Sequence, residues 1–195
     1  GRSDSLSLGD LQSLDAGYHF SPDGKTYPFR DKQITIPTLD EVFTAFPQIR
    51  FLIEIKDNSD TLALDLCRTV KRFKLEQQVS VASFRNGPLE AFKDACPTVA
   101  TSTPSSASLA FTLLHWLRLD AAYHPTHQAF QFPLRMGNMD LVGRRFIERA
   151  HAHNVQVHAW TINEPDTMRR LIDLGVDGLV TDYPDRLLKI LQRLP

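Results

Sequence analysis

The chain has 195 residues, of which 42% are hydrophobic and 23% are charged, as is ordinary for one globular domain with a buried core. Its 22 Lys and Arg residues nearly balance its 23 Asp and Glu residues, so a global basic field for nucleic acid is excluded. No run of about 18 or more apolar residues predicts a transmembrane segment. The polar first residues show no secretory signal, and we expect a cytoplasmic location.

Residues 1–36 are expected to lie outside the core. Leu8 to Asp15 form a candidate short helix, and Ser21-Pro22-Asp23-Gly24 is a turn by composition. Thr38 is followed three positions later by Glu41, the pattern of a capping box. It predicts a helix that ends before Pro47.

From residue 51 onward, strand patterns alternate with helix patterns. The expected strands are 51–56, 79–83, 98–101, 129–132, 155–160 and 176–180. The expected helices are 62–75, 88–95, 106–119, 141–153 and 165–174. Strands separated by helices favour parallel pairing, which predicts an α/β fold with an open sheet or part of a β/α barrel.

The two cysteines, Cys67 and Cys96, fall within or at the end of predicted helices and form no CxxC pair. We therefore expect neither a structural disulfide nor a zinc site. His151 and His153 are two positions apart on a helix and point to different sides, so we expect them at the surface. His124 and His127 lie in a loop with no carboxylate near them in sequence, which makes them poor candidate ligands.

Residues 155–187 predict polar side chains at the ends of two consecutive strands. Pro165 begins the helix between these strands and Gly175 ends it. Ligands of such units bind beyond the carboxyl ends of the strands, where Trp160, Asn163, Thr181 and Asp182 are expected. Trp160 has a simpler interpretation as barrel-mouth packing, and Asp182 as a cap of the next helix.

Glu54 and Lys56 place two charges on a strand that is otherwise apolar. Side chains alternate across a strand, so these two share one face, and Phe51, Ile53 and Ile55 share the other. Buried charges are costly unless they are paired or bind a metal. The alternatives are an internal ion pair or exposed strand end, or a metal-binding carboxylate beside an ammonium that holds a phosphate.

Several segments occur in the order typical of one family. They are Ile36 to Val42, Ile53 to Lys56, Val81 to Phe84, Val157 to Asn163 and Gly175 to Pro184. With them the chain resembles the glycerophosphodiester phosphodiesterase family. The resemblance implies a TIM-type β/α barrel of the phospholipase-C-like phosphodiesterase kind, here incomplete, with strands three to eight. Residues 1–195 would be a single domain, with 1–36 the tail of the family insertion and 37–195 the barrel units.

The resemblance further implies a phosphoric diester hydrolase of lipid and glycerol metabolism. Such an enzyme uses a divalent cation, Ca²⁺ or Mg²⁺, to hydrolyse a glycerophosphodiester or lysophospholipid to an alcohol and glycerol 3-phosphate. Glu54 matches the metal carboxylate and Lys56 the phosphate contact, so both are the expected catalytic residues. Trp160, Phe84 and Gln131 are the expected further substrate-binding residues.

The chain also departs from the family pattern. The His-Arg-Gly strand, the Glu-x-Asp pair and the His-Asp of the insertion are absent, and none of the seven histidines occurs in such a context. One carboxylate cannot hold Ca²⁺ or Mg²⁺ tightly. The alternative is therefore a catalytically incomplete fragment, inactive in isolation, or a noncatalytic binding module of the same fold. Another phosphate-handling barrel is disfavoured because no Gly-rich phosphate loop occurs.

Overall fold

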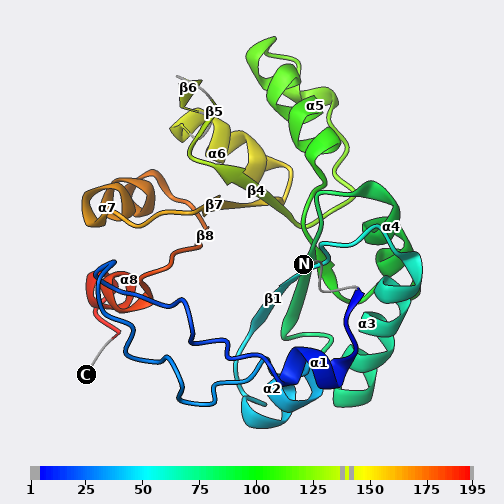
Figure 1. The fold of residues 1–195 in the computed structure, drawn as a ribbon. Helices are drawn as coiled ribbons and strands as arrows, with labels where there is room; N and C mark the ends of the chain where they lie inside the picture. Colours follow the sequence, from blue (N-terminus) through cyan, green and yellow to red (C-terminus); the bar gives the residue numbers. More distant parts are fainter. Residues whose placement is uncertain (1–4, 137–138, 141–142, 194–195) are drawn as a thin grey trace. The chain divides into compact units, whose positions relative to one another are not determined.

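The structure, a computed structural model, describes residues 5–136, 139–140 and 143–193 (Figure 1). The chain divides into two compact units, Gly1–Ile49 and Arg50–Pro195. The first contains α1 (Leu8–Gln12) and α2 (Leu39–Ala45), and the second contains the strands and the other helices. The assignment of 1–36 as the tail of an insertion stays a prediction.

Side-chain hydrogen bonds to the backbone shape the first unit. The predicted capping box is confirmed, because the Thr38 hydroxyl accepts from the Glu41 N–H while the Glu41 carboxylate accepts from the Thr38 N–H. The Asp23 carboxylate accepts from the N–H groups of Lys25 and Thr26, which holds the predicted turn. These hydrogen bonds lower the pKa of Asp23 to about 2.

The second unit contains two three-stranded parallel sheets. The first has the order β1 (Phe51–Glu54), β2 (Val79–Ala82), β3 (Ala100–Thr101), and the second β4 (Ala129–Pro133), β7 (Gln156–Trp160), β8 (Gly178–Leu179). An isolated parallel bridge between Ser102 and Ala129 links β3 to β4. All six predicted strands are thus present and parallel, and their assignment as strands three to eight of a barrel stays a prediction.

The predicted helices are also present, and two features were not predicted. The helices are α3 (Asp60–Phe73), α4 (Asn86–Ala95), α5 (Ser105–Trp116), α6 (Arg144–Ala152), α7 (Pro165–Leu174) and α8 (Pro184–Ile190), with a 3-10 turn at Asp120–Ala122. A small antiparallel pair, β5 (Arg135–Met136) and β6 (Met139–Asp140), lies before α6, and α8 was not assigned from sequence. The predicted start of the sixth helix at Leu141 lies outside the described residues.

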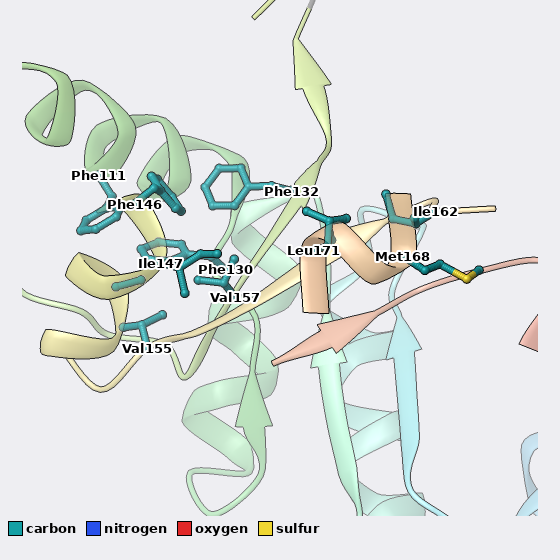
Figure 2. Packing of buried hydrophobic residues seen from close by; sticks show 12 residues of the cluster. Phe111, Phe130, Phe132, Phe146, Ile147, Val155, Val157, Ile162, Met168 and Leu171 are labelled. Carbon is teal, nitrogen blue, oxygen red and sulfur yellow. The ribbon is translucent and has the colours of Figure 1, made fainter. Parts of the chain in front are cut away.

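Aromatic packing builds the core between β4, β7 and the helices α5, α6 and α7 (Figure 2). Phe111 of α5 and Phe130 of β4 are fully buried, with ring centroids 4.6 Å apart. Phe146 of α6 and Val157 of β7 complete this layer. Burial of each such side chain stabilises the folded chain by roughly 1.5–3 kcal/mol. The cluster therefore holds the helices against one face of β4 and β7. The opposite face of these strands carries Gln131 of β4 and His158 and Trp160 of β7.

Cys67 and Cys96 form a disulfide, which corrects the sequence-based expectation. Cys67 lies on the buried face of α3, and Cys96 is the buried C-cap of α4. The two helices pack against each other, and the Cα atoms of the two cysteines are 5.8 Å apart. The separation of 29 positions exceeds any local cysteine motif. Only the packing of the two helices brings the sulfur atoms together, so the spacing rule missed the pair.

Glycine is required at Gly175 and Gly178 for different reasons. Gly175 has φ of 95° and closes α7 in the left-handed conformation, as predicted. Gly178 lies opposite His158 in the β7–β8 ladder, and a Cβ built there would be 2.8 Å from Cδ2 of the imidazole. The ring of His158 therefore occupies the space of a side chain on β8.

We expect Gly178→Ala to lower the free energy of unfolding by about 1–3 kcal/mol, because the added methyl group must displace the His158 ring. Urea denaturation followed by circular dichroism measures the change. Gly87→Ala is the matched control, since a Cβ there makes only an ordinary contact, 3.6 Å from the Asp60 carboxylate. Equal stability of the two variants would contradict the close packing of His158 on Gly178.

Candidate active site

A cavity of about 690 Å³ lies at the carboxyl ends of the strands of the second unit. The five residues that the family resemblance assigned to catalysis, metal binding or substrate binding line it, namely Glu54, Lys56, Phe84, Gln131 and Trp160. They come from β1, β2, β4 and β7 or from the residues that follow these strands. The carboxyl ends of parallel strands meet at one edge, which explains why positions about 100 residues apart converge.

Glu54 and Lys56 form an ion pair at the edge of this cavity. The Lys56 Nζ lies 2.6 Å from the Glu54 Oε2, and the two side chains are 77% and 29% exposed, respectively. Strand β1 ends at Glu54, two residues earlier than predicted, so Lys56 follows the strand. The other oxygen, Oε1, is buried and has no hydrogen-bond partner among the described residues. The pair thus joins a largely exposed ammonium to a partly buried carboxylate, and Glu54, which lines the cavity, retains one acceptor oxygen without a partner among the described residues.

Two aromatic rings stand beside Lys56. Phe84 and Trp160 make an edge-to-face contact with centroids 5.8 Å apart, and the Lys56 Nζ lies 5.9 Å from the Phe84 centroid. Phe84 is 58% exposed, so this ring is not part of the core. The Ser83 hydroxyl, next to Phe84 in the sequence, donates to the Ile55 carbonyl at 2.8 Å and joins the end of β1 to the end of β2. This hydrogen bond holds the Lys56 and Phe84 segments side by side.

Ser102 and Gln131 supply neutral polar groups to the same cavity. The Ser102 Oγ and the Gln131 Nε2 are both buried and have no hydrogen-bond partner among the described residues. An unsatisfied buried polar group is costly, and a cluster of such atoms is typical of a site whose ligand completes the hydrogen bonds. Sequence reasoning identified Gln131 and missed Ser102, because a lone Ser after a two-residue strand carries no motif.

Asn163, Thr181 and Asp182 do not line the cavity, in contrast to Trp160. The Asn163 Oδ1 accepts from the Thr181 hydroxyl at 3.1 Å and from the Asp182 N–H at 3.0 Å. The Asn163 Nδ2 donates to the Asp182 carboxylate at 2.9 Å. These residues bind one another and join the end of β7 to the end of β8. The N-cap of α8 is Tyr183, so Asp182 does not cap that helix.

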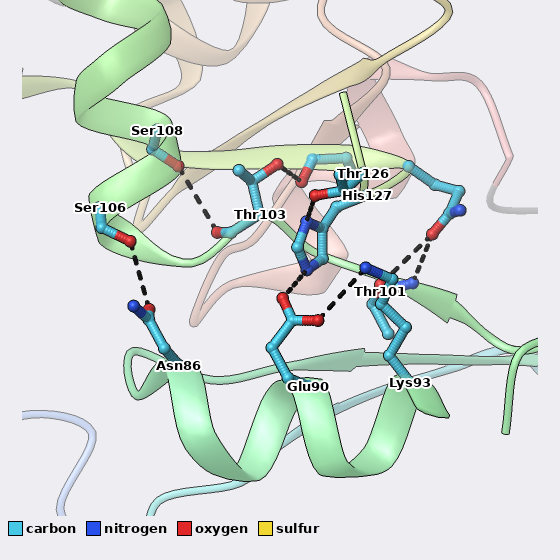
Figure 3. Close-up of polar contacts among 11 residues, drawn as sticks. Asn86, Glu90, Lys93, Thr101, Thr103, Ser106, Ser108, Thr126 and His127 are labelled. Carbon is cyan, nitrogen blue, oxygen red and sulfur yellow. Dashed lines mark hydrogen bonds and ion pairs between the residues drawn. The ribbon is translucent and has the colours of Figure 1, made fainter. Parts of the chain in front are cut away.

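No histidine is among the described residues that line the cavity. His127 belongs to the segment before β4 and is buried against α4 (Figure 3). Its Nδ1 lies 2.8 Å from the Thr126 hydroxyl. Its Nε2 lies 3.4 Å from a Glu90 oxygen, and Glu90 also pairs with Lys93 at 3.3 Å. A carboxylate that is distant in the sequence therefore lies next to His127 in the fold. His151 is exposed as predicted and pairs with Asp177, whereas the Nε2 of His153 is buried.

Burial lowers the pKa of His127, and the nearby Lys93 ammonium acts in the same direction. The folded chain therefore favours neutral His127. This stabilisation is present above the unfolded pKa of about 6.5 and is lost as the pH falls through the lower folded pKa. We expect a smaller free energy of unfolding at about pH 5 than at about pH 7.

The variant His127→Gln tests this prediction by urea denaturation at both pH values. Glutamine keeps a polar side chain but does not titrate, so the difference between the two pH values is expected to shrink. It does not vanish, because burial also lowers the pKa of His115 and of His158. A pH dependence that is the same in His127→Gln and the parent would show that His127 contributes nothing to it.

The described residues do not by themselves fit a Ca²⁺ or Mg²⁺ site. Among them no group of three or more His, Cys, Asp or Glu side chains is placed to bind a metal. Glu54 is the one carboxylate that lines the cavity within the described part of the chain, and it offers a single free oxygen. These cations require about six or more oxygen ligands.

None of the described helices combines the length and apolar character that crossing a bilayer demands.

Several known proteins resemble this chain over most of its length. A probable glycerophosphodiester phosphodiesterase 2 of Mycobacterium tuberculosis is 33% identical over 162 residues, which cover 80% of this chain and 60% of that protein. The chain thus spans less than two thirds of this relative. A lysophospholipase D of Rattus norvegicus is 28% identical over 184 residues, covering 82% of this chain and 57% of that protein.

Solved structures share the fold. The glycerophosphoryl diester phosphodiesterase domain of a Mycobacterium tuberculosis protein has a TM-score of 0.82 at 16% identity, covering 100% of this chain and 77% of that chain. A phosphodiesterase of Oleispira antarctica, solved with the product sn-glycerol-3-phosphate, has a TM-score of 0.68 at 21% identity, covering 98% of this chain and 73% of that chain. The sequence model of a family of phosphoric diester hydrolases matches residues 1–186. The chain belongs to this family, the glycerophosphoryl diester phosphodiesterase family.

Proposed function

We propose that the cavity binds and hydrolyses glycerophosphodiesters, giving an alcohol and glycerol 3-phosphate, in lipid and glycerol metabolism. The observation that carries this proposal is the Glu54–Lys56 pair beside Phe84 and Trp160 in one cavity at the strand ends. Hydrolysis adds the hydroxyl of water to phosphorus and a proton to the departing alcohol oxygen. Family membership and the product named for the Oleispira antarctica structure support this substrate class.

Each lining group has a role that its chemistry suits. The Lys56 ammonium is largely exposed and can leave Glu54 to contact the phosphoryl oxygens, where it stabilises developing negative charge. Phe84 and Trp160 provide an apolar surface for the carbon chain of glycerol or of the alcohol. Ser102 and Gln131 donate hydrogen bonds to substrate oxygens, because neither group has a partner among the described residues.

A divalent cation, Ca²⁺ or Mg²⁺, belongs to this proposal with Glu54 as one ligand. When bound, such an ion withdraws electron density from the phosphoryl group. Glu54 is the one carboxylate among the described residues of the cavity lining, and one carboxylate does not complete a site for this ion. We expect the 195-residue chain alone to bind either cation only weakly, in the millimolar range or above.

The second candidate is a noncatalytic binding module of the same fold. It is favoured by the cavity lining, which contains one carboxylate and no histidine among the described residues. Without an acid or base close to the phosphoryl group, a bound ester would stay intact. The two candidates share the binding site and differ only in turnover.

Release of glycerol 3-phosphate from glycerophosphocholine separates the two candidates. The measurement uses the longest protein that the gene encodes and the 195-residue chain, each with Mg²⁺ or Ca²⁺ and with EDTA. Cation-dependent release by the longest protein supports the enzyme. Binding of glycerol 3-phosphate without turnover by either form supports the module, and lysophosphatidylcholine in place of glycerophosphocholine tests the lysophospholipid substrates.

The expected cytoplasmic location stays a prediction. The Cys67–Cys96 disulfide weighs against it, because structural disulfides persist mainly in oxidising compartments.

A further inference from the structure

Helix α5 presents its large apolar side chains to the outside. Leu109, Leu113, Trp116 and Leu117 recur at helical spacing and are 46–68% exposed, and Leu119 follows the helix. We call these five residues the α5 face. The opposite side of the helix carries buried Ser108 and Thr112, which line the cavity, together with Phe111 in the core.

This arrangement reverses the pattern of a surface helix in water. Such a helix normally turns polar residues outward and apolar residues inward. Contiguous exposed apolar side chains on one face mark an interaction site. Leu and Trp on the outer face are typical of helices that lie in the interfacial region of a bilayer.

The charges around the α5 face suit an anionic surface. No Asp or Glu occurs from residue 97 to residue 119, and Arg118 is exposed at the end of the helix. Asp120 is buried and paired with Arg149. On the neighbouring helix α6, exposed Arg145 is close enough to His115 of α5 to lower the pKa of that histidine, whereas exposed Arg144 donates to the Asp173 carbonyl of α7. Glu148 is the one exposed carboxylate of α6. Basic side chains beside an apolar face favour anionic lipids.

The α5 face is continuous with the cavity. Leu109 belongs to the face and also lines the cavity with Lys56 and Trp160. A lipid whose phosphate contacts Lys56 can therefore direct its hydrocarbon chain past Leu109 toward the surface on which the face rests. We propose that the α5 face docks the protein on anionic phospholipid membranes next to the opening of the cavity. Its use for presenting a lipid substrate rests on the proposed function, whereas the docking itself does not.

A second copy of the chain suits this face less well. An isologous contact through α5 would bring one Arg118 from each copy to the apolar interface, and residues 97–119 supply no carboxylate to pair with either. An anionic bilayer instead accepts the leucines and tryptophan among its acyl chains and places phosphates beside the arginine.

Flotation with vesicles tests the docking. The vesicles contain equal parts of phosphatidylglycerol and phosphatidylcholine, and phosphatidylcholine alone serves as the neutral comparison. We expect the chain to bind the anionic vesicles at least tenfold more strongly than the neutral ones. The double variant Leu113→Ser/Leu117→Ser is expected to lose at least tenfold in vesicle affinity. Leu62→Ser/Leu64→Ser on α3, with comparably exposed leucines, is the matched control and is expected to bind as the parent does.

The two tryptophans give an independent readout. In Trp160→Phe the remaining Trp116 is expected to show a blue shift of its fluorescence on adding anionic vesicles. No binding by the parent, equal loss in the α3 variant, or a lipid-free dimer that the α5 substitutions dissociate would overturn the proposal. Hydrolysis of water-soluble glycerophosphocholine reports on the proposed function separately, so its failure leaves the vesicle result standing.

Discussion

Glu54→Gln is expected to lower kcat for glycerophosphocholine by about 100-fold or more in the longest protein that the gene encodes. Glutamine keeps the size of the side chain and one oxygen that can accept from Lys56, but it removes the negative charge of the carboxylate and replaces its second oxygen with an amide NH₂. Lys56→Met is expected to lower kcat/KM by a similar factor, because the ammonium beside the cavity is lost while the methylene chain remains. Steady-state kinetics at saturating cation measure both.

The controls for this prediction are Glu148→Gln and Lys189→Met. Both residues are exposed on helices of the same unit and neither lines the cavity, so rates close to those of the parent are expected. Unchanged kcat in Glu54→Gln would refute the role assigned to this carboxylate. Unchanged kcat/KM in Lys56→Met would show that the Lys56 ammonium does not act on the substrate and that the ion pair only stabilises the fold.

Replacing both cysteines, in Cys67→Ala/Cys96→Ala, is expected to lower the free energy of unfolding by about 3–4 kcal/mol. The disulfide closes a loop across 29 positions, and cross-linking a loop of this length restricts the unfolded chain by about that amount. Each alanine also removes a buried sulfur from the contact between α3 and α4, which adds to the loss. Urea denaturation of the parent and the double variant gives the difference.

Thiol titration of the unfolded parent supplies the check on this second prediction. We expect no free thiol in the parent before reduction and two after it, since the chain has two cysteines. Two free thiols before reduction, or a double variant as stable as the parent, would contradict a structural disulfide between α3 and α4.

Sequence reasoning succeeded where a short-range pattern has one physical solution. The capping box at Thr38 and Glu41 and the stop of α7 at Gly175 depend only on neighbouring residues, and both were predicted correctly. The six parallel strands followed from their alternation with helices. Charge on an otherwise apolar strand predicted either an ion pair or exposed strand end, or a metal and phosphate site; the structure shows the Glu54–Lys56 ion pair, and the roles of the two residues in catalysis stay a prediction.

Features that depend on contacts between distant segments were missed. The disulfide joins α3 to α4, and His127 meets Glu90 across the gap between two segments. Ser102 gains its place in the cavity only because β3 is linked to β4. The pair β5 and β6 has two residues in each strand, too few for an alternating pattern. In each case the information lies in the tertiary arrangement and leaves no local periodicity.

Titration of the chain with sn-glycerol 3-phosphate, followed by the two tryptophan indole signals in NMR spectra, tests the cavity assignment most directly. Trp160 lines the cavity with Lys56, whereas Trp116 lies on the exposed side of α5 and outside the cavity lining. We predict a saturable shift of the Trp160 signal, none for Trp116, and loss of the shift in Lys56→Met. A shift that persists in Lys56→Met, or that affects only Trp116, would contradict a phosphate ester site at Glu54 and Lys56.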